Sequence, residues 1–175
     1  ALAGRCALAL GGRTFVLTTT LRALQQIGAA LREQLVADGI QVFVQGEAPK
    51  RAMLAQFLAA PRAVLVGSHS FWEGIDVPGD ALQCVLIDKL PFPPPNDPLA
   101  EARSRQIEAE GGNAFNDYFI PETAIALKQG AGRLIRDEAD RGVLMICDPR
   151  LTTKSYGRRI GCAEVAAASG EVVSP

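Results

Sequence analysis

Apolar and polar stretches alternate along the chain in a way that predicts strands and helices in turn. Short apolar runs indicate strands buried on both faces, and stretches with apolar residues three or four positions apart indicate helices. The predicted strands are residues 14–18, 41–45, 62–66, 83–87 and 142–147, and the predicted helices are 21–37, 51–59, 98–110 and one that includes 129–136. This alternation predicts an α/β fold with a mostly parallel central sheet and helices on both faces.

The segment QGAGRLIR, residues 129–136, places Gln129, Arg133 and Arg136 four and then three positions apart, so that on a helix they share one face. The complementary face carries a stripe of apolar residues, Ile120, Ala124, Leu127, Ala131 and Leu134. Guanidinium groups stay charged and match phosphate geometry, and an amide can bind a phosphate oxygen or a water. The alternative is a solvated basic face, which has no need of two helix-weakening glycines at 130 and 132.

A second polar stretch, residues 67–92, lies between two apolar runs that read as buried strands. Loops at strand ends are where open α/β sheets carry ligands. Glu73 and Asp76 place two carboxylates in this loop, and Gly74 allows a tight turn between them. Taken alone, the stretch is also compatible with an ordinary polar turn.

Thr18, Thr19 and Thr20 follow the first predicted strand and begin the next predicted helix. Their hydroxyls and the first helical N–H groups are suited to binding a phosphate without reading sequence. The alternative is a plain threonine N-cap, which needs only one of the three. Ser68 and Ser70 are weaker candidates for the same contacts.

Together these stretches resemble the DinG/XPD type of superfamily-two helicases. FWEGIDVPG resembles helicase motif V, QGAGRLIR resembles motif VI, and GRTFVLTTTLRAL resembles motif IV of that family. The segment KLPFPPPNDPLAEAR is similar to one found in the bacterial DinG and YoaA branch. The resemblance runs from about Gly12 to about Arg159, which is nearly the whole chain.

The resemblance implies that residues 1–160 form the second RecA-like domain of a helicase, a three-layer fold with a Pro-rich and helical insertion at about 91–120. Residues 161–175 are expected to form a flexible tail. The chain contains no G-x-x-x-x-G-K-[ST] loop and no DEAH-like acidic box, so it cannot complete an ATPase site alone. The family places those parts, and an iron–sulfur cluster, in an N-terminal RecA-like domain of the same protein.

The resemblance also implies roles for the candidate residues. ATP and Mg²⁺ would lie between the two domains, and the motor would move along single-stranded DNA with 5′-to-3′ polarity in DNA repair or replication. Arg133 and Arg136 would be arginine fingers, and Gln129 would assist them. Glu73, Gly74 and Asp76 would contact the nucleotide. The DNA backbone would be contacted by Thr18, Thr19, Ser68 and Ser70. The alternative is a non-catalytic domain that docks a replication protein through the Pro-rich insertion.

Charge and hydropathy bear on the expected DNA contacts and on the location of the protein. The 175 residues include 18 basic and 19 acidic side chains, so no global field attracts nucleic acid, and any DNA contact must be local. No apolar run approaches the ~20 residues that span a bilayer. We therefore expect no membrane association and a cytoplasmic location.

The four cysteines lie far apart in the sequence and form no C-x-x-C pair. Cys84 and Cys147 fall in apolar runs and are expected to pack as small hydrophobic residues. The sequence therefore predicts no metal site in this chain.

Overall fold

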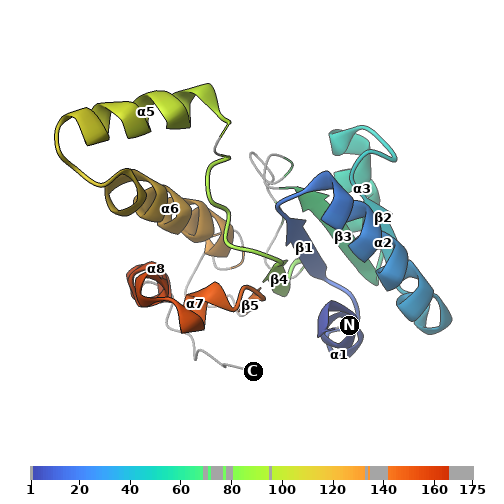
Figure 1. Ribbon diagram of the computed structural model, residues 1–175. Coiled ribbons are helices and arrows are strands. Elements are labelled where there is room, and N and C mark those ends of the chain that lie inside the picture. The colour runs from blue at the N-terminus through green and yellow to red at the C-terminus, as the bar shows by residue number, and fades with distance from the viewer. Residues whose placement is uncertain are drawn as a thin grey trace. The chain divides into compact units, whose positions relative to one another are not determined.

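The computed structural model describes residues 2–68, 71, 77, 81–94, 96–132, 134 and 142–165, which form two compact units (Figure 1). Unit 1 comprises residues 1–89 and 130–147, and unit 2 comprises 90–129 and 148–175. The Pro-rich insertion predicted at about 91–120 falls within unit 2.

Unit 1 contains a five-stranded sheet in the order β2-β3-β1-β4-β5. All four neighbouring pairs are parallel, which confirms the predicted α/β fold with a parallel sheet. The strands are β1 (Thr14–Thr18), β2 (Gln41–Val44), β3 (Ala63–Ser68), β4 (Cys84–Ile87) and β5 (Val143–Ile146), each within two residues of its predicted bounds.

Helices cover both faces of this sheet, as predicted. The helices of unit 1 are α1 (Leu2–Ala9), α2 (Leu21–Leu35), the 3-10 turn η1 (Val36–Asp38) and α3 (Lys50–Ala59). On one face, α1 and α2 pack against Val16, Val64 and other valines of the sheet. On the other face, Phe57 of α3 packs against Phe15 of β1, with ring centroids 5.0 Å apart. Helix α1 was not predicted from the sequence.

Local sequence explains why α2 forms where it does. Thr20 is its N-cap, and the Thr20 hydroxyl accepts a hydrogen bond from the Ala23 N–H at 3.2 Å. The buried positions are Leu24, Gly28, Leu31 and Leu35, which repeat with the helical period. Because a Cβ at Gly28 would lie 2.6 Å from a methyl group of Val44, glycine lets α2 approach the sheet closely.

Strand β2 is at the edge of the sheet, and an ion pair covers its outer side. The Arg32 guanidinium donates two hydrogen bonds to the Val42 carbonyl, at 3.2 and 3.0 Å. The Glu47 carboxylate accepts one from the Val44 N–H at 3.2 Å and pairs with Arg32. Side chains of this domain therefore occupy backbone groups that an exposed edge strand would offer to another chain.

The turn into β1 depends on Gly12. Its φ is +98°, and an added Cβ would lie 2.4 Å from the Ala63 nitrogen, which is backbone and cannot swing away. We expect Gly12→Ala to lower the free energy of unfolding by about 2 kcal/mol, because left-handed strain and overpacking act together. Urea unfolding of the two purified proteins measures the difference.

Gly39 provides the matched control for this substitution. Its φ is +68°, but an added Cβ would meet nothing within 4 Å. Gly39→Ala should therefore cost only the strain of the backbone, about 1 kcal/mol. Equal losses for the two variants would contradict a steric role for Gly12.

Unit 2 consists of helices. They are α5 (Pro98–Ala109), the π-helical turn η3 (Phe115–Phe119), α6 (Ile120–Ala131), α7 (Arg150–Thr153) and α8 (Ser155–Val165). Helix α5 begins as predicted, because Asp97 accepts hydrogen bonds from the N–H groups of Leu99 and Ala100. Helix α8 continues to Val165, and so includes the first residues of the tail predicted at 161–175.

Candidate functional site

The turn between β1 and α2 lies at the carboxyl edge of the parallel sheet, where ligands bind in open α/β folds. The structure separates the roles of its three threonines. Thr18 is 1% exposed, and its hydroxyl lies 3.4 Å from the carbonyls of Thr20 and Gly67. Thr19 is exposed, and Thr20 caps α2. The expectation that the Thr18 hydroxyl contacts DNA is therefore wrong, since that group is buried against backbone, and Thr19 remains the candidate.

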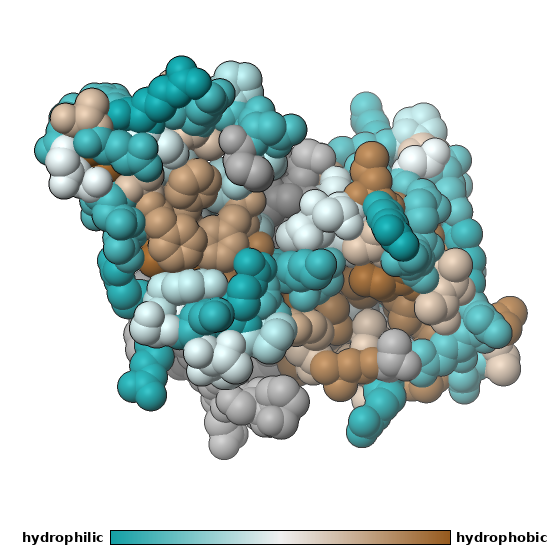
Figure 2. Space-filling view, in the orientation of Figure 1, coloured by the Kyte–Doolittle hydropathy of each residue, from teal (hydrophilic) through white to brown (hydrophobic). Residues whose placement is uncertain are grey.

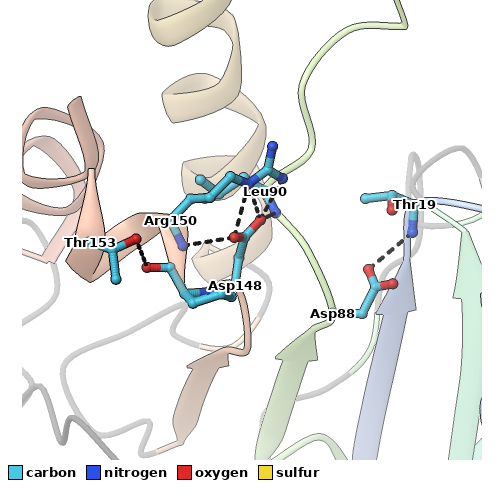
Figure 3. Close-up of polar contacts among 7 residues, drawn as sticks. Thr19, Asp88, Leu90, Asp148, Arg150 and Thr153 are labelled. Atoms are coloured by element: carbon cyan, nitrogen blue, oxygen red, sulfur yellow. Dashed lines mark hydrogen bonds and ion pairs between the residues drawn. The ribbon is translucent and has the colours of Figure 1, made fainter. Parts of the chain in front are cut away.

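Asp88 fixes the backbone of Thr19. It follows β4, the neighbour of β1, and its Oδ1 accepts a hydrogen bond from the Thr19 N–H at 3.1 Å (Figure 3). A carboxylate on this N–H orients the start of α2 and takes up one of the donors that a phosphate would otherwise use. The remaining polar groups of the turn are the Thr19 hydroxyl and the later N–H groups of the helix.

Ser68 lies at the end of β3, directly beside Thr18 in the register of the sheet. Its N–H donates to the side chain of Gln45 at 2.6 Å, and the residue is half-buried. Phe71 is 7% exposed, with Lys50 above its ring at 5.4 Å, so it packs within the domain. Ser70 lies outside the described residues.

Two cations at this edge were missed by the sequence analysis. Arg22 is exposed in the first turn of α2, which contains no acidic residue, and Lys89 is exposed just after β4. A cation at a helix N-terminus opposes the helix dipole, at a cost of typically 0.3–1 kcal/mol. That unfavourable placement was the signal available in the sequence, and an anionic ligand at the edge would offset it.

The predicted phosphate-binding helix ends earlier than expected. Helix α6 stops at Ala131, and the described residues just beyond it, Gly132 and Leu134, lie in turns. The two glycines that weaken the helix account for the difference. Three residues of the predicted apolar stripe, Ile120, Leu127 and Leu134, are at most 3% exposed, while Ala124 is half-buried.

Gln129 is exposed near the end of α6. Arg133 and Arg136 lie outside the described residues, and so do Glu73, Gly74 and Asp76. The two strands that flank the motif V loop, β3 and β4, are buried as predicted.

An ion pair between a buried carboxylate and a partly exposed arginine in unit 2 was not anticipated. Asp148 is 5% exposed, and its carboxylate accepts hydrogen bonds from the Leu90 N–H at 2.9 Å, the Arg150 N–H at 2.9 Å and the Arg150 guanidinium at 2.6 Å (Figure 3). Burial alone would raise the pKa of this carboxyl group. The hydrogen bonds and the charge of Arg150 outweigh it and lower the pKa from 3.8 to about 2.

The described cysteines divide into different environments. Cys84 is fully buried, and burial raises the pKa of its thiol to about 12, as expected for a small packing residue. The same expectation for Cys147 is wrong, because β5 ends at Ile146 and leaves Cys147 exposed. Among the described residues, no three His, Cys, Asp or Glu side chains are arranged to hold a metal ion.

Residues 5–162 match the family model described as the helicase C-terminal domain. This chain belongs to the helicase C-terminal domain family. The ATP-dependent DNA helicase YoaA of Haemophilus influenzae is 49% identical over 146 residues, which are 83% of this chain and 22% of that protein. The ATP-dependent helicase DinG of Mycobacterium tuberculosis is 42% identical over 149 residues, 85% of this chain and 22% of that protein.

A solved structure of Xpd4 from S. tokodaii has the same fold, with a TM-score of 0.59 at 19% identity over 90% of this chain and 30% of that one. The family model and the YoaA and DinG relatives, together with this shared fold, confirm the predicted resemblance to the DinG/XPD type. This helicase C-terminal domain spans about a fifth of the length of the curated relatives it matches. Within its described part, no helix is both long and apolar enough to cross a membrane.

Proposed function

We propose that this chain is the second RecA-like motor domain of an ATP-dependent DNA helicase that acts in DNA repair or replication in the cytoplasm. The observation that carries the proposal is the carboxyl edge of the sheet, where Thr19, Arg22, Ser68 and Lys89 gather at the ends of three adjacent strands. The names of the relatives, ATP-dependent helicases, support the same function. A partner from replication and the 5′-to-3′ polarity belong to this proposal as well.

The proposal gives the chain half of an ATP site. Its sequence contains no P-loop, so the N-terminal RecA-like domain would hold the phosphates and Mg²⁺. This chain would contribute Arg133 and Arg136 to the γ-phosphate, and Gln129 to a phosphate oxygen or the attacking water. Contacts to the ribose or to the fingers are proposed for the motif V loop, namely Glu73, Gly74 and Asp76.

The described cysteines do not fit an iron–sulfur cluster. Cys84 is buried in the sheet with a raised thiol pKa, and no three metal-binding side chains converge among the described residues. We therefore propose that any such cluster is held by cysteines outside this chain.

The DNA contacts follow the same edge of the sheet. The Thr19 hydroxyl, Arg22 and Lys89 would bind backbone phosphates, with Ser68 and Ser70 continuing the track. Thr18 would contribute indirectly, since its buried side chain stabilises the turn in which Thr19 is exposed.

The first test of the half-site is ATP hydrolysis by the chain alone. We expect no turnover above background, because the arginines act only on a phosphate that another domain holds. A phosphate-release assay with and without single-stranded DNA measures this. Turnover that Arg136→Ala abolishes would mean that this chain carries a complete site.

The second test is DNA binding. Because few phosphates are contacted, we expect weak binding without base preference, and Arg22→Ala should flatten the slope of log K against log salt by about 0.7. Fluorescence anisotropy with a labelled single strand at several salt concentrations measures the slope.

Arg62 supplies the matched control. It immediately precedes β3, at the amino edge of the same sheet, and it is exposed. Arg62→Ala removes the same charge from the domain and should leave the slope unchanged. A similar decrease for both variants would indicate a general charge effect and would reject the carboxyl edge as the DNA track.

A further inference from the structure

Three aromatic side chains from separate segments of unit 2 form one cluster. Phe92 stacks on Phe115 with ring centroids 5.7 Å apart and planes 25° apart. The Tyr156 ring meets both edge-on, at 6.1 and 5.1 Å. The guanidinium of Arg150 lies 5.3 Å from the centre of the Phe92 ring and is itself held by Asp148. The Phe115 ring is therefore supported by fixed neighbours.

The cluster is open to solvent at Phe115. This side chain is 41% exposed, while Phe92 and Tyr156 are half-buried. Figure 2 shows apolar side chains gathered on the visible surface of unit 2 between α5 and the α7–α8 segment, next to hydrophilic residues of α7 and α8. A rigid, exposed ring supported from behind is suited to stacking on a planar group, because little side-chain freedom is lost on binding.

Positive charge predominates on α7 and α8 beside the cluster, where Asp148, which pairs with Arg150, and Glu164 flank a basic segment. Residues 149–163 contain four cations and no acidic residue, although the whole chain has a net charge of −1. Lys154, Arg158 and Arg159 are exposed. Arg159 donates a hydrogen bond at 3.1 Å to the side chain of Asn116, the residue next to Phe115. Cations thus adjoin the exposed ring.

We propose that this surface, Phe115 with Arg159 and the neighbouring cations of α7 and α8, is a second single-stranded DNA site that stacks an unpaired base on Phe115. An exposed aromatic ring and a cluster of cations together match a strand that offers both a base and a phosphate. A duplex has no base free to stack on the ring. The inference rests on the proposed function, since it assigns a new contact to the same substrate.

The test uses the full 175-residue chain and two labelled oligomers of equal length, dT20 and a 20-unit strand of abasic linkages. Phe115→Ala should weaken dT20 binding about 5-fold or more and change abasic binding less than 2-fold, because only the first strand has bases. Phe115→Trp should preserve dT20 binding. Leu99→Ala is the matched control, since Leu99 of α5 is also apolar and is 65% exposed.

The outcomes separate this inference from the proposed function. Equal losses on both oligomers, or none, would overturn base stacking at Phe115. If Arg22→Ala weakens dT20 binding while Phe115→Ala does not, only the present inference fails, and if the wild-type chain binds neither oligomer, both fail. A change in mass by light scattering on Phe115→Ala, without an effect on DNA, would assign the surface to a second copy of the chain.

Discussion

Replacing Arg133 or Arg136 by alanine in the complete helicase is expected to lower kcat for ATP by about 10³-fold. Arginine fingers neutralise charge that develops on the transferred phosphoryl group, so their loss acts mainly on the transition state. The affinity for single-stranded DNA should stay within about 2-fold of the wild type, because the proposed DNA track lies elsewhere, at Thr19 and Arg22. Steady-state hydrolysis at saturating DNA and anisotropy without nucleotide measure the two quantities.

Arg105 is the matched control for this experiment. It lies on α5, pairs with Glu101, and its side chain is 75% exposed. Arg105→Ala removes one guanidinium from the surface and should leave kcat unchanged. If Arg133→Ala or Arg136→Ala reduces DNA affinity as strongly as kcat, the arginines contact the DNA backbone and the finger assignment fails.

The sheet could be predicted from the sequence because each strand is a short, continuous apolar run. Strands β1 and β4 are buried along their whole length, and the run of apolar letters is the direct consequence of that burial. Helix α2 could be predicted as well, since its buried leucines repeat with the helical period. The polar turns at the carboxyl edge were located for the same reason, as the places where these runs stop.

The features that could not be predicted from the sequence depend on how neighbouring elements pack. Whether Thr18 or Thr19 faces solvent depends on the packing of β1 against β3, which the three identical threonine letters do not encode. Cys147 looked like part of a strand, but the strand ends one residue earlier. The burial and pairing of Asp148 could not be predicted, because its hydrogen-bond partner Leu90 is 58 positions away along the chain.

Asp148 is buried and accepts hydrogen bonds from two backbone N–H groups. We expect Asp148→Ala to lower the free energy of unfolding by about 4 kcal/mol, because it leaves the Leu90 and Arg150 N–H groups without their acceptor and removes the buried carboxylate that pairs with the Arg150 guanidinium. Arg150 remains 41% exposed, so its charge can be solvated and the loss stays in the middle of the usual range. Asp148→Asn keeps the shape and removes the charge, and should cost about 2 kcal/mol.

The pH dependence distinguishes this charge from simple packing. A carboxyl group whose pKa falls from 3.8 unfolded to about 2 folded contributes about 2 kcal/mol above pH 5, and the contribution is lost as the pH falls through 3.8 toward 2. The stability difference between wild type and Asp148→Asn, measured by urea unfolding, should therefore be constant from pH 7 to 5 and shrink below. Glu101→Gln, at an exposed pair, should change stability by less than 1 kcal/mol at every pH. A difference for Asp148→Asn that did not shrink in acid would assign the loss to the hydrogen bonding of the amide and not to the charge, because protonation of the wild-type carboxyl would then have changed nothing.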